Sequence, residues 1–222
     1  GLRRVVIGME DPDPRVSGKG ISRLKDCGLE VITGVLRKEC EAMNREFVFR
    51  VKTGRPWGIL KWAMSLDGRI ALPNGESKWI SGEKARAWVH ILRAKCDAVI
   101  VGSGTIRSDD PLLTSRGKRN PEPLRVVFSK SLNLPSKANL WNTSLAKTVL
   151  ACSEEAFKQG KEPPDGPEAL LLSAAEPSLL LDALAQRGCN RVLWECGPSL
   201  ATAAIKQQCV QELAVVVGPK LL

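Results

Sequence analysis

Short apolar runs rich in β-branched residues alternate along this chain with segments in which apolar residues recur at helical spacing. The apolar runs predict strands at residues 3–7, 29–32, 57–64, 98–101, 124–128, 147–151, 169–172, 191–195 and 213–217. The helical spacing predicts helices at residues 21–27, 38–51, 83–94, 154–159, 178–187 and 199–208. Alternation of this kind is typical of an α/β fold with a largely parallel central sheet.

A short segment with glycine and proline, Lys52 to Pro56, separates a predicted helix from a predicted strand. We therefore place a boundary near residue 55 and expect two parts, residues 1–53 and residues 54–222. The chain starts without Met and directly in a strand-like run. We expect it to be a fragment of a longer protein.

The composition, with 43% hydrophobic and 26% charged residues among 222, is that of a folded globular protein. No apolar run approaches the roughly 20 residues that cross a bilayer, and no signal-peptide pattern is present, so we expect no membrane partner. The net charge of +9 indicates an anionic partner, but the cations are spread along the chain. A small phosphorylated ligand fits this spread better than nucleic acid does, and a basic nucleic-acid-binding module is the weaker alternative.

The cysteines and the single histidine limit which catalytic and metal sites we expect. The seven cysteines contain no Cys-x-x-Cys pair, which is typical of free thiols in a reducing compartment. His90 is the single histidine, so a Ser-His-Asp site and a classical zinc site are both disfavoured, and we expect no metal. Because His90 lies off the apolar stripe of the helix predicted at 83–94, we expect an exposed or half-buried helix residue.

Charged residues stand in or just after several predicted strands. Lys61 lies in the middle of an apolar strand, and a buried ammonium group needs either an anionic partner or a route to solvent. Asp109 follows a strand and a glycine-containing turn, where backbone amides can approach a phosphate. Glu195 ends another strand, directly before a helix that opens with Gly197 and Pro198. Since ligands of α/β sheets bind at the carboxyl ends of the strands, we predict a catalytic cluster of Lys61, Asp109 and Glu195.

Three stretches then show a resemblance: LKWAMSLDGRIALPNGESKWIS, GSGTIRSDDPLLTSR and LWECGPSLATA. In this order and spacing they closely resemble the reductase domain of the bifunctional riboflavin-biosynthesis enzymes of the RibD family, from about Gly54 to Leu222. The resemblance implies a dihydrofolate-reductase-like fold and NADPH-dependent reduction of the ribosyl group of 5-amino-6-(5-phosphoribosylamino)uracil, a phosphorylated aminopyrimidine, to the ribityl form.

The front of the chain, through DPDPRVSGKGISRLKDCGLEV, resembles the C-terminal part of that family's cytidine-deaminase-like α/β domain. The zinc motif of such deaminases is missing here, and a zinc deaminase cannot activate water without its ligands. We therefore expect no zinc and no deamination from residues 1–53. The family pattern continues after Leu222, so we expect residues 54–222 to be C-terminally incomplete.

The resemblance also implies site residues at matching positions. Implied cofactor positions are Ala63, Trp79, Thr105, Asp109, Lys130, Gly197, Pro198, Ser199, Leu200, Ala201, Thr202 and Ala203. Implied substrate positions are Ser77, Arg93, Leu113, Arg116 and Glu195. The two arginines suit a ribose phosphate because a guanidinium group can bind phosphate with two hydrogen bonds. Lys130 stands where the pattern leads us to expect a small hydroxyl residue, and both a contact to the 2'-phosphate of NADPH and a solvent-facing side chain stay open.

Two alternatives to the reductase remain besides nucleic-acid binding. A catalytically silent homologue that acts as a scaffold is the first, since the missing end could leave the site unformed. A true dihydrofolate reductase is the second, although the substrate-facing arginines and the deaminase remnant disfavour folate. The resemblance further implies a homodimer, located in the cytoplasm or, for a plant source, in the chloroplast stroma.

Overall fold

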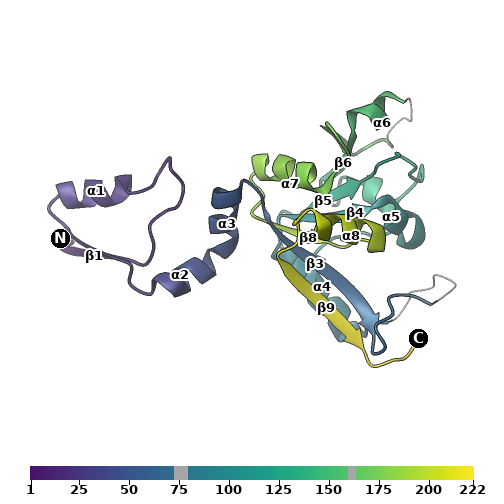
Figure 1. Ribbon diagram of the computed structural model, residues 1–222, viewed down its shortest axis with the longest axis horizontal. Helices are drawn as coiled ribbons and strands as arrows, with labels where there is room; N and C mark the ends of the chain where they lie inside the picture. The colour runs from purple at the N-terminus through teal and green to yellow at the C-terminus, as the bar shows by residue number, and fades with distance from the viewer. Residues whose placement is uncertain (73–79, 160–163) are drawn as a thin grey trace. The chain divides into compact units, whose positions relative to one another are not determined.

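The computed structural model describes residues 1–72, 80–159 and 164–222, and Figure 1 labels their helices and strands. The chain divides into two compact units, Gly1–Pro56 and Trp57–Leu222. The division falls at the end of the Gly- and Pro-containing segment, where a helix gives way to a strand.

The first unit has a small parallel sheet of two strands, β1 (Arg4–Ile7) and β2 (Glu30–Thr33). Its helices are α1 (Lys19–Asp26), α2 (Arg37–Met43) and α3 (Arg45–Thr53). None of these three helices buries a residue, and large apolar side chains such as Val6 and Ile32 are exposed. This unit therefore has little hydrophobic core of its own.

The single helix predicted at 38–51 is wrong in one respect, because the structure has two helices that meet at Asn44. The backbone N–H and the side-chain amide of Asn44 both donate to the carbonyl oxygen of Cys40, at 3.1 and 2.9 Å. Asparagine side chains compete with the helical hydrogen-bond pattern in this way, and here the first helix ends at Met43. Gly54, at φ 75°, then ends α3 in the left-handed conformation that glycine adopts most easily.

The second unit is built on a seven-stranded sheet in which every pairing is parallel. Its strand order is β7-β6-β5-β4-β8-β3-β9. The strands are β3 (Trp57–Ser65), β4 (Ala98–Gly102), β5 (Leu124–Phe128), β6 (Thr148–Ser153), β7 (Glu168–Leu172), β8 (Arg191–Trp194) and β9 (Glu212–Gly218). The predicted α/β class and parallel central sheet are confirmed.

Helices cover this sheet on both faces (Figure 1). They are α4 (Glu83–Ala94), α5 (Ser103–Asp109), α6 (Glu154–Lys158), α7 (Pro177–Gln186) and α8 (Pro198–Lys206), with a short 3-10 helix at Asn139–Trp141. Alternate residues of the central strands enter different apolar clusters: Val99 packs with α4 and α5, whereas Ile100 packs with α7 and α8. Burial on both faces explains why the strands read as continuous apolar runs in the sequence.

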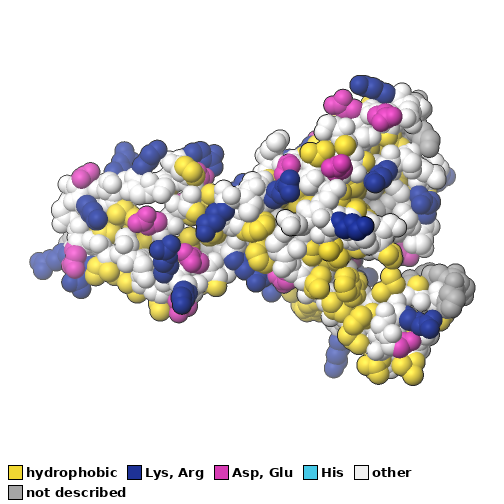
Figure 2. Space-filling model, viewed as in Figure 1, with side chains coloured by type: hydrophobic (Ala, Val, Ile, Leu, Met, Phe, Trp, Pro, Cys, Tyr) yellow, Lys and Arg dark blue, Asp and Glu magenta, His cyan; other side chains and the backbone are white. Residues whose placement is uncertain are grey.

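The outer strand β9 is covered less completely than the central strands. Its residues Leu213, Val215 and Val217 are exposed by 56%, 37% and 49%, and Figure 2 shows hydrophobic side chains gathered over this part of the sheet. Among the residues that the structure describes, no helix combines the length and the apolar character needed to cross a membrane.

Parallel pairing brings the carboxyl ends of the strands to one edge of the sheet. In the pairing of β3 with β8, Leu60 lies opposite Trp194. The next residues of the two strands, Lys61 and Glu195, therefore become neighbours, although 133 positions separate them in the sequence. The backbone N–H of Glu195 donates to the carbonyl oxygen of Ile100 in β4 at 2.9 Å, which keeps this edge ordered beyond the end of β8.

Candidate active site

Glu195 is the centre of a charged cluster at the carboxyl edge of the sheet. Its carboxylate accepts two hydrogen bonds from the guanidinium group of Arg93 in α4, at 2.5 and 3.0 Å. The ammonium group of Lys61 lies 3.7 Å from the Glu195 Oε2 atom. The exposed fractions of the three side chains are 9% for Glu195, 13% for Arg93 and 21% for Lys61. The anionic partner that the sequence analysis expected for Lys61 is therefore Glu195.

Burial by itself would raise the pKa of the Glu195 carboxyl group, because it disfavours the charged form. The charge and hydrogen bonds of Arg93, followed by the charge of Lys61, outweigh burial, and the pKa of Glu195 is lowered. The carboxylate is therefore ionised at neutral pH. It holds two cations, one through direct hydrogen bonds and the other through a longer ionic contact.

This cluster lies in the wall of a cavity of about 730 Å³. Predicted site residues in the wall are Lys61, Ala63, Arg93, Thr105, Asp109, Leu113, Arg116, Glu195, Gly197 and Pro198. Asp109 is exposed and lines the same cavity as Lys61, but the structure shows no ion pair between them. Of the two carboxylates expected near the lysine, only Glu195 is at ionic-contact distance.

Helix α4 presents a polar face to this cavity. Arg86, His90 and Arg93 line it and are spaced by four and three residues, which places them on one side of a helix. The Nδ1 atom of His90 lies 3.1 Å from the carbonyl oxygen of Thr114, and since a carbonyl only accepts, His90 donates there. Burial lowers the pKa of His90, which favours the neutral ring. His90 is half-buried, as the sequence analysis expected, but it is a site residue that the sequence analysis missed.

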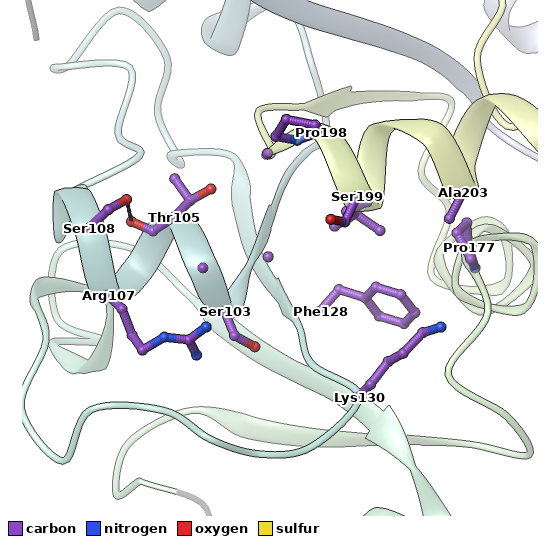
Figure 3. A pocket seen from close by; sticks show the side chains of 14 residues that line it. Ser103, Thr105, Arg107, Ser108, Phe128, Lys130, Pro177, Pro198, Ser199 and Ala203 are labelled. Carbon is purple, nitrogen blue, oxygen red and sulfur yellow. Dashed lines mark hydrogen bonds between the residues drawn. The ribbon is translucent and has the colours of Figure 1, made fainter. Parts of the chain in front are cut away.

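A second cavity of about 570 Å³ lies between α5 and α8. Figure 3 shows Ser103 and Thr105 of α5 on one side and Ser199 and Ala203 of α8 on the other, with Phe128 and Lys130 below α8 in this view. The two cavities share Thr105, Ser108, Gly197 and Pro198 as lining residues, so they adjoin one another. Cationic groups enter the second cavity from Arg107 and Lys130.

The start of α8 suits an anionic group. The helix begins with Pro198 after Gly197, and no side chain caps its first backbone N–H groups. Uncapped N–H groups and the helix dipole favour negative charge at this end. A Cβ atom added at Gly197 or at Gly104 would have no neighbouring atom within 4 Å. The glycines therefore leave room along the wall of the second cavity.

Most of the predicted cofactor positions line one cavity or the other, but the predicted run 197–203 does so only in part. Ser199, Leu200 and Ala203 line the second cavity, whereas Ala201 is buried against the apolar cluster and Thr202 is exposed away from both cavities. Helical periodicity is the reason, because consecutive residues of α8 face different directions. Ser77 and Trp79 lie outside the described residues.

Several wall residues were not singled out from the sequence. They include Arg86, His90 and Cys196 in the first cavity and Ser103, Arg107, Phe128 and Pro177 in the second. The spacing of Arg86, His90 and Arg93 along α4 was a usable signal, since it forms a polar stripe beside the apolar one. Burial raises the pKa of the Cys196 thiol to about 12, so this cysteine is a poor nucleophile at neutral pH.

A metal centre has no ligand set in the part of the chain that the structure describes. In residues 1–72, 80–159 and 164–222, no group of three or more His, Cys, Asp or Glu side chains could hold a metal ion. The charged groups at the sheet edge are instead joined to one another as ion pairs.

Comparison with known sequences identifies relatives along the whole chain. The family model described as RibD C-terminal domain matches residues 56–222. The riboflavin biosynthesis protein RibD of Synechocystis sp. is 44% identical over 226 residues, which cover 100% of this chain and 61% of the relative. The chloroplastic riboflavin biosynthesis protein PYRR of Zea mays is 37% identical over 234 residues, which cover 100% of this chain and 38% of the relative.

Solved structures agree with the sequence relatives. A diaminohydroxyphosphoribosylaminopyrimidine deaminase/5-amino-6-(5-phosphoribosylamino)uracil reductase from Thermotoga maritima has a TM-score of 0.87 at 33% identity, covering 100% of this chain and 61% of that one. RibD of Acinetobacter baumannii has a TM-score of 0.84 at 33% identity, covering 99% of this chain and 62% of that one.

The chain thus spans about three fifths of the length of these RibD proteins. The family model covers the whole seven-stranded sheet and both cavities. The resemblance noted in the sequence is confirmed, and the chain belongs to the RibD family, with residues 56–222 forming its C-terminal domain.

Proposed function

We propose that the second unit is an NADPH-dependent reductase of riboflavin biosynthesis, which reduces the ribosyl group of 5-amino-6-(5-phosphoribosylamino)uracil to ribityl. One observation carries this proposal: a cavity with hydroxyl groups, cations and an open helix start adjoins a cavity that contains the Lys61–Glu195–Arg93 cluster. A reductase of this kind must hold a dinucleotide beside a phosphorylated substrate. The Thermotoga maritima relative is named for this reductase activity.

The second cavity has groups that can bind the phosphates of a dinucleotide. The start of α8 and the Ser199 hydroxyl would contact the pyrophosphate, and Lys130 would contact the 2'-phosphate. Thr105 and Pro198 line both cavities, so they would contact the nicotinamide ring where the cavities adjoin. Ala63 would be a small wall residue there. Bound NADPH would supply the hydride; the protein has to orient the two molecules and exclude water.

Lys61 is the residue that we assign to proton delivery. In the proposed reaction the bond between C1' and the ring oxygen breaks, a hydride forms the new C–H bond at C1', and a proton converts the ring oxygen into a hydroxyl group. The ammonium group of Lys61 would donate that proton, or would donate a hydrogen bond to the ring oxygen before the proton is transferred. Glu195 holds the ammonium group at the sheet edge, and Arg93 holds Glu195.

In this proposal Arg116 binds the phosphate of the substrate. Arg93 was expected from the sequence to bind this phosphate, but its guanidinium group already donates to Glu195 and to the carbonyl oxygen of Thr114. We therefore propose that Arg93 positions Glu195. Arg116 is exposed and lines the same cavity, and a guanidinium group there can bind a phosphate with two hydrogen bonds.

We further propose that residues 1–53 are the last part of a deaminase-like domain without catalytic zinc. The support is that the Thermotoga maritima structure, whose name includes a deaminase, matches 100% of this chain. The predicted homodimer remains a proposal that light scattering would test. The plant relatives are named as chloroplastic, which is why a chloroplast location is proposed alongside a cytoplasmic one.

A turnover assay with the purified chain tests the reductase proposal. NADPH oxidation is followed after addition of the aminopyrimidine substrate, and the product is identified by its mass as the ribityl compound. A parallel titration with NADPH and with NADH, read by tryptophan fluorescence, measures cofactor binding, because Trp62 lines the first cavity. Saturable binding of NADPH without turnover would favour a silent homologue, and the absence of both in a folded chain would refute the reductase.

A further inference from the structure

Residues 111–117, here called the cavity loop, leave α5 and run along the wall of the first cavity. Leu113 and Arg116 of this loop have φ angles of 53° and 55°. Side chains other than glycine are strained in this left-handed region, and such residues persist only where their surroundings hold them. The conformation that brings Arg116 to the cavity therefore depends on other groups.

One of these groups is the carboxylate of Glu122. It accepts the backbone N–H of Ser115 at 2.6 Å and the backbone N–H of Gly117 at 2.9 Å. These two N–H groups belong to the neighbours of Arg116 on either side. Ser115 is fully buried, which makes an unpaired N–H at that position costly. A single carboxylate thus holds the backbone N–H of the residue before and of the residue after the strained arginine.

The charge of Glu122 is part of this arrangement. Burial would raise the pKa of Glu122, but the hydrogen bonds from Ser115 and Gly117 outweigh it, so the pKa is lowered. The carboxylate is ionised at neutral pH, and its two hydrogen bonds are of the stronger, charge-assisted kind. Glu122 itself does not line either cavity, so it does not contact a ligand there.

A second anchor of the loop works without Glu122. The carbonyl oxygen of Thr114 accepts hydrogen bonds from Arg93 and from His90, each at 3.1 Å. This anchor connects the loop to the Arg93–Glu195 pair, whose own geometry involves no atom of Glu122. Removal of Glu122 should therefore disturb Arg116 and leave the Lys61–Glu195 contact in place.

We propose that Glu122 is a positioning residue that holds Arg116 in the conformation needed to bind the phosphate of the substrate. The inference rests on the proposed function, because that function makes the phosphate of the substrate the ligand of Arg116. Glu122 acts through the backbone on either side of Arg116, so it sets the affinity for the phosphorylated substrate and leaves the chemical step unchanged.

The test compares Glu122→Ala, Glu122→Gln and the matched exposed control Glu155→Ala. Glu122→Ala should raise KM for the aminopyrimidine by about tenfold, the size of one lost charge-assisted hydrogen bond, with kcat and the Kd of NADPH unchanged. Glu122→Gln keeps one neutral acceptor oxygen and should raise KM less than Glu122→Ala does. Glu155→Ala should resemble the wild type. An equal fall in kcat, or a weaker Kd for NADPH, would show a general structural role and overturn the proposal.

A double-mutant cycle with Arg116→Ala isolates the route of the effect. In the Arg116→Ala background, Glu122→Ala should change KM very little, because the group that it positions is gone. Effects that add fully would overturn the proposal. Inorganic phosphate serves as a probe that requires no turnover: Glu122→Ala should weaken its binding only while Arg116 is present. If phosphate binds in this pattern but the wild type has no reductase activity, the proposed function fails and the inference about Glu122 stands; no phosphate binding by the wild type would overturn the inference.

Discussion

Lys61→Met removes the ammonium group from the site while keeping a side chain of similar length. Two unit charges about 4 Å apart attract each other by about 4 kcal/mol at an effective dielectric constant of about 20, before desolvation is subtracted. The Lys61–Glu195 distance is 3.7 Å, and Lys61 is 21% exposed, so the net contribution to folding is much smaller. Glu195 also keeps both hydrogen bonds from Arg93 in this variant. We expect the free energy of unfolding to fall by about 1 kcal/mol.

The expected loss of activity is much larger. A positioned acid contributes about 100-fold to 10,000-fold to the rate of a proton-transfer step, which corresponds to about 3 to 5 kcal/mol of activation free energy. Arg93→Met should behave differently, because it leaves the carboxylate of Glu195 buried with only the ammonium group at 3.7 Å. Breaking a buried ion pair on one side costs about 3 to 5 kcal/mol of stability. Lys61→Met should therefore lower activity strongly and stability only slightly, whereas Arg93→Met should lower both.

The assay measures kcat and KM from substrate-dependent NADPH oxidation, and the free energy of unfolding from urea denaturation. Lys206→Met, at the exposed end of α8, is the matched control and should leave both unchanged. Turnover of Lys61→Met within about threefold of the wild type would refute the assigned proton-delivery role, since a positioned acid contributes far more. A loss of stability as large as that of Arg93→Met would show that Lys61 is needed for folding of the site and would refute this prediction.

Three further predictions follow from the same geometry. Lys130→Ala should raise the Kd of NADPH, measured by calorimetry, by about tenfold and leave the Kd of NADH unchanged. Lys206→Ala is the control. An equal loss of affinity for both cofactors would place Lys130 away from the 2'-phosphate. Because the pKa of Glu195 is lowered on folding, its stabilising contribution is present above the ordinary pKa of about 4.3 and is lost as pH falls through the lower folded value. Urea denaturation of Glu195→Gln should thus show a deficit at neutral pH that shrinks in acid, and a deficit independent of pH would contradict this. Gly58→Ala should destabilise the sheet by about 3 kcal/mol, since a methyl group would overlap the carbonyl oxygen of Cys209, and a wild-type unfolding free energy would exclude the close approach.

Local patterns in the sequence predicted the strands of the second unit and its helices α4, α6, α7 and α8, whereas α5 was read only as a turn and the 3-10 helix at Asn139–Trp141 was not predicted. Helix α4 was predicted with its observed bounds, as was β5, because each has a strong periodic or continuous apolar pattern with clear ends. The first unit was harder, since its helices bury no residue, and the hydrogen bonds of Asn44 divided a segment that the pattern joined. Weak burial leaves such segments to local side-chain chemistry.

The sequence by itself determined the α/β class, the family motifs and the presence of Lys61, Asp109 and Glu195 in or after strands. Only the tertiary structure decided which of these groups meet. The strand order places β8 between β4 and β3, and its register sets Glu195 beside Lys61 and under Arg93 of α4. Strand order depends on how distant segments share the burial of their apolar faces, and local patterns do not carry that information. The same reason explains why Arg93, expected from the sequence to bind phosphate, has Glu195 as its partner.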